Sequence, residues 1–177
     1  AGLAKKACAA EIDGTPADLR IIVSGDCGLT ILTFEDEGGR AAFHHTTSHI
    51  LAQAVKRLFP ETKLAIGPSI ADGFYYDFDR PEPFSPEDLE ALEAEMKKIV
   101  KEDLKLEYFT LPREEAIALM KEKDEPYKVE LIEDLPEEET ISFYRQGEYT
   151  DLCAGPHLMT TGPVKAFKLT SIAGAYW

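Results

Sequence analysis

The spacing of hydrophobic positions changes along the chain, and each spacing predicts a different element. In residues 45–58 the apolar side chains recur every three or four positions and Pro60 closes the segment, which predicts a helix facing the core. In residues 73–78, GFYYDF, the aromatic side chains at even-numbered positions alternate with Tyr75 and Asp77, which predicts a half-buried strand. Both segments are therefore expected to bury one face.

Residues 85–102 carry the clearest helix start in the chain. Ser85 is a suitable N-cap, and Pro86 suits the first turn. Glu87 and Asp88 place carboxylates at the positive end of the helix dipole. An apolar stripe follows, and the many charges opposite it indicate a solvated face, not an acidic ligand site.

Beyond this helix the pattern predicts mostly strands. Residues 105–110, KLEYFT, are expected to form a strand, and a helix is expected to begin near Arg113. Four further segments have the composition of strands: YKVELI at 127–132, ISFYRQ at 141–146, YTDLC at 149–153 and VKAFKLTSI at 164–172. Long helices with several strands predict an α+β fold in which an antiparallel sheet packs against helices.

The first 36 residues form a smaller unit with its own pattern. We expect a short helix at 3–10, a turn at Asp13-Gly14 and a strand at 29–34. This unit has too few apolar residues for a core of its own, so it is expected to be the later part of a longer module. The acidic, glycine-rich stretch 35–39 marks the boundary, which predicts units at 1–36 and 37–177. The chain ends in apolar GAYW, so we expect a truncation there too.

Charge and composition narrow the classes of function. The chain has 19 basic and 33 acidic side chains and a net charge of −14, so any nucleic-acid contact must be local or supplied by a longer protein. No apolar run approaches the roughly 18 residues of a membrane span, and the N-terminus lacks a signal peptide's apolar region. We expect a cytoplasmic protein with no membrane partner. The three cysteines, an odd number at wide spacing, are expected to be reduced thiols.

Candidate chemistry gathers in two four-residue spacings, which hold three of the four histidines. His45-x-x-x-His49 lies in the predicted helix, where residues four apart share a face with about 5–6 Å between their β-carbons. Cys153-x-x-x-His157 follows a predicted strand and contains Gly155-Pro156, which predicts a tight loop. Together these four side chains could hold zinc in a tetrahedral shell.

Several observations limit this zinc interpretation. A single histidine near an apolar helix face is usually only hydrogen-bonded. Thr46 follows His45, so the glutamate of the H-E-x-x-H metalloprotease pattern is missing and a zinc peptidase is not expected. Four protein ligands would also leave no position for a catalytic water. His44 points about 100° away from its neighbour on a helix, and we assign it no role beyond packing or solvent contact.

Several of these segments share a resemblance to one protein family. HTTSHILAQAVKRLFP, IGPSIADGFYYDFD, YKVELI, YTDLCAGPH and AGAYW together resemble the editing domain of bacterial threonyl-tRNA synthetases, from about residue 40 to 177. AGLAKKACAAEIDG and LTILTFEDEGG resemble the later half of the ubiquitin-like TGS module that precedes that domain, which implies a partial β-grasp unit. The implied function is hydrolysis of mischarged Ser-tRNA(Thr), an aminoacyl-tRNA deacylase within a threonine-tRNA ligase.

The resemblance also implies partners and cofactors. The partners would be the 3' acceptor end of tRNA(Thr) carrying serine and the remainder of the synthetase, its catalytic and anticodon-binding domains, in a homodimeric parent enzyme. The family's editing site is described as working without a metal, so no cofactor is expected, with zinc possible but not favoured. Nothing in the chain resembles the class II catalytic motifs, so it should not charge tRNA itself.

Residue roles follow from the resemblance, with catalysis by water. Lys128 is expected on the YKVELI strand, projecting into the pocket to position or activate the water. Tyr76 and Asp151 would orient the water and the ribose hydroxyls.

The histidines and the cysteine would contact the substrate. His45 and Cys153 would hold the terminal adenosine and the seryl group, and His49 would support them. His157 would crowd the side-chain pocket and so disfavour threonine. A thioester on Cys153 is conceivable, but positioned water should suffice for so reactive an ester.

Two alternatives remain open. The first is a zinc-dependent, alanyl-type trans-editing protein, against which the TGS-like beginning argues. The second is a non-catalytic tRNA-docking module, which would be insensitive to changes at Lys128.

Overall fold

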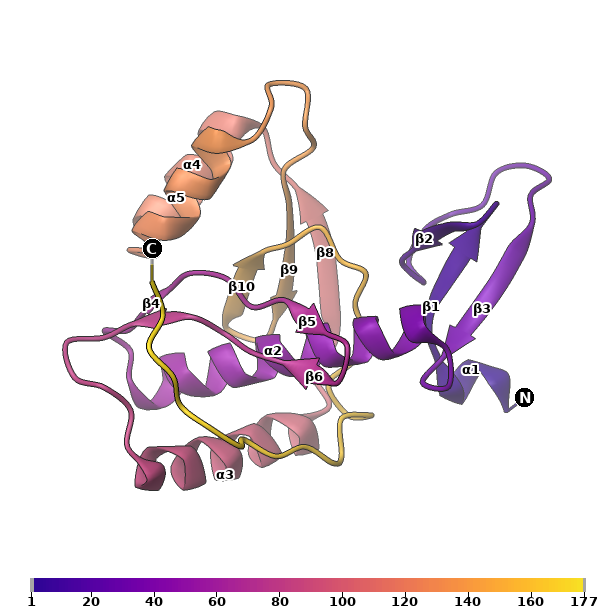
Figure 1. The fold of residues 1–177 in the computed structure, drawn as a ribbon. Helices are drawn as coiled ribbons and strands as arrows, with labels where there is room; N and C mark the ends of the chain where they lie inside the picture. Colours follow the sequence, from indigo (N-terminus) through magenta and orange to yellow (C-terminus); the bar gives the residue numbers. More distant parts are fainter. Residues whose placement is uncertain (1, 177) are drawn as a thin grey trace.

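The computed structural model describes residues 2–176 and shows small antiparallel sheets packed against helices (Figure 1). The predicted α+β class is therefore confirmed. No helix in the described residues is long and apolar enough to cross a membrane. The elements, in chain order, are α1 (Leu3–Lys6), β1 (Ala7–Ile12), β2 (Thr15–Ala17), β3 (Leu29–Thr33), α2 (Glu37–Leu58), β4 (Lys63–Leu64), β5 (Ser69–Ile70), β6 (Gly73–Phe74), β7 (Phe78–Asp79), α3 (Pro86–Glu102), β8 (Leu106–Thr110), α4 (Arg113–Glu122), α5 (Pro126–Asp134), β9 (Ser142–Gln146) and β10 (Tyr149–Leu152).

The N-terminal sheet has the order β2-β1-β3, with both pairs antiparallel. The turn predicted at Asp13-Gly14 joins β1 to β2, and both residues have positive φ, 51° and 81°. The helix predicted at 3–10 is wrong in its second half, because α1 ends at Lys6 and Ala7–Ile12 is the central strand of the sheet. Strand pairing on both sides of β1 outweighs the helix preference of its alanines.

Helix α2 begins directly after this sheet and runs through the rest of the molecule (Figure 1). Residues 37–39 of the predicted boundary stretch belong to the helix, so they form no loop. A β-carbon on Gly39 would lie 1.8 Å from the carbonyl oxygen of Thr33, so only glycine permits this approach between α2 and β3. Ala9, Leu32 and Ala42 bury the contact between sheet and helix.

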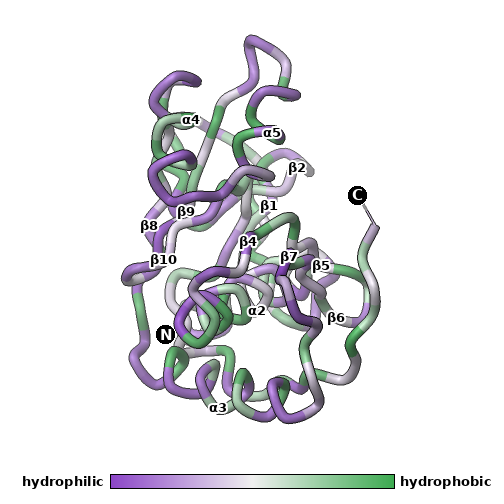
Figure 2. The backbone as a smooth tube through the Cα atoms, turned by 90° about the vertical axis from the view of Figure 1, so that its left-hand side faces the viewer, coloured by the Kyte–Doolittle hydropathy of each residue, from purple (hydrophilic) through white to green (hydrophobic). Residues whose placement is uncertain are grey.

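The main core lies between α2 and α3. Ser85 starts α3 as predicted: its hydroxyl accepts from Asp88 N at 3.2 Å, and the Asp88 carboxylate accepts from Ser85 N at 2.8 Å. Figure 2 shows hydrophobic and hydrophilic residues alternating along α3, as expected for a helix with one buried face. The buried residues of this cluster are Cys8, Ile50, Leu51, Ala52, Ala54, Val55, Leu64, Tyr76, Leu92, Met96, Ile99, Val100, Tyr149, Leu158 and Val164.

A second layer combines the sheet β10-β9-β8 with α4 and α5, which share one hydrophobic cluster with it. The strands predicted at 105–110, 141–146 and 149–153 correspond to β8, β9 and β10, and α4 begins at Arg113 as predicted. The strand predicted at 127–132 is wrong, because these residues lie in α5. Pro126 occupies the first turn of α5, and Ile132 packs into a cluster with α4 and the sheet.

Two other strand predictions are corrected. Residues 73–78 do not form one strand: β6 pairs with β5, and β7 pairs with β4. The predicted alternation persists between them, since Tyr75 is exposed and Tyr76 is buried. Residues 164–172 form no strand, and instead run beside α3, where Leu169 N and Lys168 Nζ donate to the carboxylate of Glu93.

Candidate functional site

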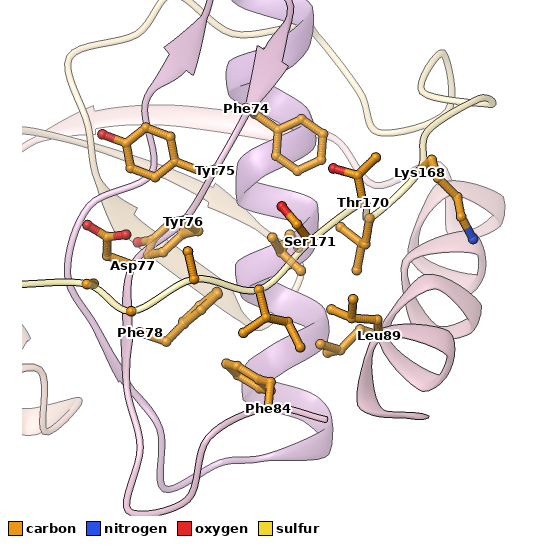
Figure 3. A pocket seen from close by; sticks show the side chains of 17 residues that line it. Phe74, Tyr75, Tyr76, Asp77, Phe78, Phe84, Leu89, Lys168, Thr170 and Ser171 are labelled. Carbon is orange, nitrogen blue, oxygen red and sulfur yellow. The ribbon is translucent and has the colours of Figure 1, made fainter. Parts of the chain in front are cut away.

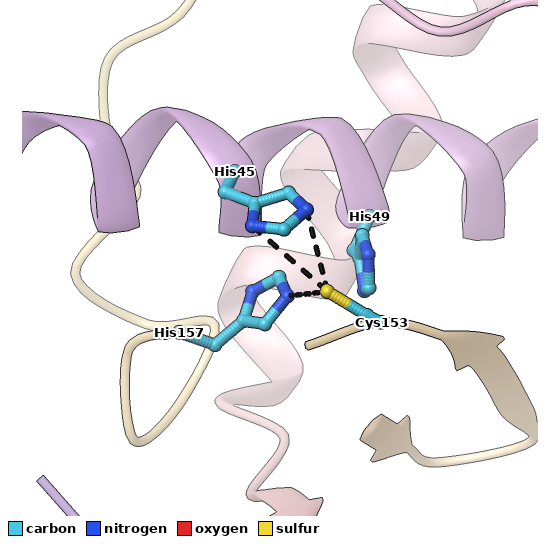
Figure 4. A group of neighbouring side chains, drawn as sticks. All are labelled: His45, His49, Cys153 and His157. Atoms are coloured by element: carbon cyan, nitrogen blue, oxygen red, sulfur yellow. Dashed lines mark hydrogen bonds between the residues drawn. The ribbon is translucent and has the colours of Figure 1, made fainter. Parts of the chain in front are cut away.

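The four side chains of the two spacings meet at one point (Figure 4). His45 and His49 lie one turn apart on α2, while Cys153 and His157 lie on the loop that follows β10. One donor atom from each lies within 4.8 Å of the others. The Cys153 sulfur is 3.1 Å from His157 Nε2 and 3.4 Å from His45 Nε2.

The imidazole rings of this cluster pack directly on one another. The His157 ring stacks on His45 and lies against His49, both at 4.2 Å between centroids. His49 and His157 are buried, whereas His45 and Cys153 are half-buried. His45 and Cys153 are therefore the two members of the cluster that keep some exposure to solvent.

Burial keeps the cluster uncharged. It lowers the pKa of all three imidazoles, and for His49 and His157 the pKa lies well below its usual value. Burial also raises the pKa of the Cys153 thiol to about 12. Near neutral pH the site therefore presents neutral imidazoles and a protonated thiol.

Asp151, on β10, is the centre of a second buried group. Lys128 Nζ lies 2.8 Å from Asp151 Oδ1, and the two side chains are only 4% and 2% exposed. Tyr76 and Tyr149 donate their hydroxyls to Asp151 Oδ2 at 2.7 and 2.6 Å. His49 Nε2 lies 3.5 Å from the same oxygen, so the carboxylate joins Lys128 to the histidine cluster.

Lys128 lies in a different secondary-structure element from the one predicted. The lysine comes from helix α5, not from a strand, and its side chain is buried. Burial raises the pKa of Tyr76 and Tyr149, so both phenols stay protonated and donate to the carboxylate. Tyr149 was missed from sequence, although its position two residues before Asp151 places both side chains on one face of β10.

Thr46 is a further contact that sequence reasoning missed. Its buried hydroxyl lies 2.9 Å from His157 Nδ1 and accepts from Leu158 N at 3.0 Å. In the sequence Thr46 stands where the H-E-x-x-H pattern has its glutamate, and its position between the two helix histidines also directs its side chain to the cluster. Thr46 fixes the orientation of the His157 ring, so that Nε2 faces Cys153.

The donor set fits zinc in its chemistry. Three imidazole nitrogens and one sulfur are ligands that zinc accepts, and the contact of Thr46 with His157 Nδ1 is of the kind that orients metal-binding histidines. If all four bound, the shell would be closed to water. Zinc in that arrangement would stabilise the loop and would not activate a nucleophile.

An aromatic cleft of about 320 Å³ lies on the other side of Tyr76 (Figure 3). Its wall combines Phe74, Tyr76 and Phe84 with the chain segment 168–175. The ring of Tyr76 lines the cleft while its hydroxyl reaches Asp151, so the two regions are adjacent. Aromatic walls with a few polar groups suit a planar ring that stacks.

Comparison with known proteins adds family information. Residues 141–175 match the family described as "Threonyl and Alanyl tRNA synthetase second additional domain". The threonine–tRNA ligase of Acetivibrio thermocellus is 69% identical over 177 residues, all of this chain and 28% of the relative. The threonine–tRNA ligase of Clostridium botulinum strain Hall is 67% identical over 175 residues, 99% of this chain and 28% of the relative. The chain thus spans little more than a quarter of the relatives it matches.

Proposed function

Because this chain belongs along its whole length to the threonine–tRNA ligase family, we propose that it forms an editing unit that hydrolyses the seryl ester of Ser-tRNA(Thr). One observation carries the proposal. The matched region 141–175 contains Asp151, Cys153 and His157, and these residues meet Lys128 and His45 in one largely buried group.

The physical need for such a unit lies in the similarity of the two amino acids. Serine lacks only one methyl group of threonine, and a binding pocket distinguishes such a difference by only about 1–3 kcal/mol. A second site that admits the smaller product and hydrolyses it corrects the remaining errors.

The proposed chemistry uses water. Lys128 carries an ammonium group with three N–H donors, and its Nζ forms an ion pair with Asp151 Oδ1 at 2.8 Å. The ammonium can therefore position the attacking water or stabilise the negative charge that develops on the ester oxygen. With a pKa of about 12, Cys153 stays a thiol near neutral pH, which disfavours a thioester route.

The other residues would bind and orient. We propose that His45 and Cys153 hold the terminal adenosine and the seryl group, that His49 supports them, and that His157 crowds the pocket against the threonine methyl. Tyr76 and Asp151 are buried and hydrogen-bonded to each other. This favours a role in orienting Lys128 over the direct contact with water and ribose hydroxyls expected from the resemblance.

The proposed partners follow from the same function. They are the 3' end of tRNA(Thr) and the catalytic and anticodon-binding domains of a homodimeric synthetase, acting in the cytoplasm. A net charge of −14 implies that this chain's own tRNA contact is a local one. We propose that hydrolysis needs no metal.

A zinc-dependent, alanyl-type editing protein is the second candidate. It is favoured by the four convergent ligand atoms and by a family description that includes alanyl enzymes. It predicts one zinc per chain and activity towards tRNA(Ala) substrates. A docking module without turnover is the third.

The test is deacylation of Ser-tRNA(Thr) by this chain beside Thr-tRNA(Thr), with and without chelator, and with zinc measured on the same sample. Lys128→Ala should abolish turnover, and Lys98→Ala should leave it unchanged because that lysine is 69% exposed on α3. Selective, chelator-resistant hydrolysis of the seryl ester supports the proposal. Stoichiometric zinc with loss of activity on chelation favours the alanyl-type protein, and binding without hydrolysis by folded chain favours the docking module.

A further inference from the structure

The connection between β2 and β3 reaches the loop that carries His157. Asp18 and Arg20 lie at the beginning of this connection, and their side chains are 16% and 15% exposed. They contact the main chain of His157 although 139 and 137 positions separate them from it. We propose that Asp18 and Arg20 are positioning residues that hold His157 in place for ester hydrolysis.

The Asp18 carboxylate uses both oxygens. Oδ2 accepts from His157 N at 3.1 Å and from the Tyr144 hydroxyl at 2.6 Å. Oδ1 accepts from Arg20 N at 2.9 Å and from Arg20 Nη1 at 2.7 Å. One carboxylate therefore fixes the backbone of His157 and orients the arginine beside it.

The Arg20 guanidinium donates to three main-chain carbonyl groups. Nη1 reaches His157 O at 3.2 Å, Nη2 reaches Leu158 O at 2.5 Å, and Nε reaches Leu106 O at 3.1 Å. The planar fork of an arginine can satisfy several acceptors at once, which an ammonium group cannot do in the same geometry. The N–H of His157 and its C=O are thus both held by the β2–β3 connection.

The same residues also confine the ring of His157, because its packing partner Tyr144 is hydrogen-bonded to Asp18. Tyr144, which donates to Asp18, packs its ring against that of His157 with centroids 4.4 Å apart. A β-carbon on Gly155, whose φ is 74°, would lie 2.2 Å from the Tyr144 hydroxyl, so the loop closes tightly on the tyrosine. Loss of the Asp18 carboxylate would release the His157 N–H and the Tyr144 hydroxyl together.

The inference rests on the proposed deacylase function, and its test is a double-mutant cycle in the chain. Asp18→Ala should lower kcat for Ser-tRNA(Thr) by about 10- to 100-fold with KM changed less than about twofold, because a displaced His157 would no longer hold the seryl ester in line with the attacking water. In a His157→Ala background the same change should add less than about twofold, because the two residues act as a unit. An unchanged kcat, or an equal loss in both backgrounds, would overturn the proposal.

Matched variants separate positioning from folding. Asp26→Ala removes an exposed aspartate of the same connection and should leave kcat unchanged. Arg20→Lys should lose more activity than Arg145→Ala. Arg145 is a suitable control because, among the ionised side chains of the described residues, it pairs only with Glu107, which is exposed. If Asp18→Ala does not fold, Asp18→Asn, which keeps one oxygen acceptor, takes its place with a smaller expected loss. Equal activity of Arg20→Lys and Arg145→Ala would contradict the assignment.

A second measurement does not depend on turnover. The imidazole ¹H–¹⁵N signals of His157 should shift or broaden in Asp18→Ala and stay in place in Asp26→Ala. An inactive wild-type chain would refute the proposed function. The imidazole signals of His157 would even then show whether Asp18 positions this residue. Unchanged signals in a folded Asp18→Ala variant would refute the positioning role even if the wild type is an active deacylase.

Discussion

Replacing Lys128 by methionine would remove the charge that faces Asp151 while keeping a side chain of similar length. Both groups are buried, at 4% and 2% exposure, and their nearest atoms are 2.8 Å apart. Breaking a buried pair from one side typically costs about 3–5 kcal/mol because the other charge is left uncompensated. Here the hydroxyls of Tyr76 and Tyr149 remain on the carboxylate, so we expect a loss near 3 kcal/mol in the free energy of unfolding.

Urea unfolding followed by circular dichroism measures this loss. With a slope of about 2 kcal/mol/M, the midpoint should fall by about 1.5 M. The double variant Lys128→Met/Asp151→Asn has no unpaired charge and should recover at least half of the lost stability. Neither variant should hydrolyse Ser-tRNA(Thr), so stability and activity would separate.

Two results would refute this reasoning. A loss below about 1 kcal/mol in Lys128→Met would mean that water reaches the carboxylate and compensates its charge. A double variant less stable than Lys128→Met would mean that Asp151 contributes through its hydrogen bonds and not through its charge.

Three further changes test other parts of the structure. Thr46→Val leaves two buried partners of its hydroxyl unpaired and should cost about 2–4 kcal/mol by urea unfolding, while Thr46→Ser, which keeps the hydroxyl, should cost much less. Ser85→Ala removes the N-cap of α3 and should cost about 1 kcal/mol, an effect that Ser85→Asp should largely avoid. Hydrogen bonding to Arg57 lowers the pKa of Glu148 below its ordinary 4.5. The stability that this pair contributes is therefore fully present above pH 4.5 and is lost as the pH falls through the lowered pKa of Glu148. Arg57→Leu should therefore be less stable at pH 7 and lose less stability than wild type between pH 4.5 and 3, and parallel pH curves would contradict this.

Local patterns predicted the elements whose signals lie in their own residues. The cap at Ser85 and the apolar spacing of α2 predicted both long helices, and the two four-residue spacings predicted the convergence of His45, His49, Cys153 and His157. In each case, residues a few positions apart determine the geometry.

The errors came where packing decided between two acceptable local structures. Val129 and Leu131 alternate with polar neighbours as in a strand, but the spacing of three from Val129 to Ile132 places these two on one helical face, where they pack beside α4. Pro126 was the overlooked helix signal. Segment 164–172 has the composition of a strand, yet no strand pairs with it within residues 2–176.

Contacts between distant residues were outside the reach of sequence patterns. Nothing near Asp18 or Arg20 indicates a contact with His157, because that contact depends on how the N-terminal sheet packs on α2. Tyr149 differs, because it lies two residues before Asp151 on the same strand, so both side chains point to one face and the contact could have been predicted.

The unbroken run of α2 has a mechanical consequence. The helix is clamped to β3 at Gly39, and ten residues further along it carries His49, about 15 Å away at the usual rise per residue. Through such a lever, a tilt of about 5° at the clamp would move the imidazole by about 1.3 Å, given that rise. A misplacement of about 1 Å can cost a reaction a hundredfold in rate. Any force that tilts the small N-terminal sheet would therefore shift His49 and could change the rate of a reaction at the histidine cluster.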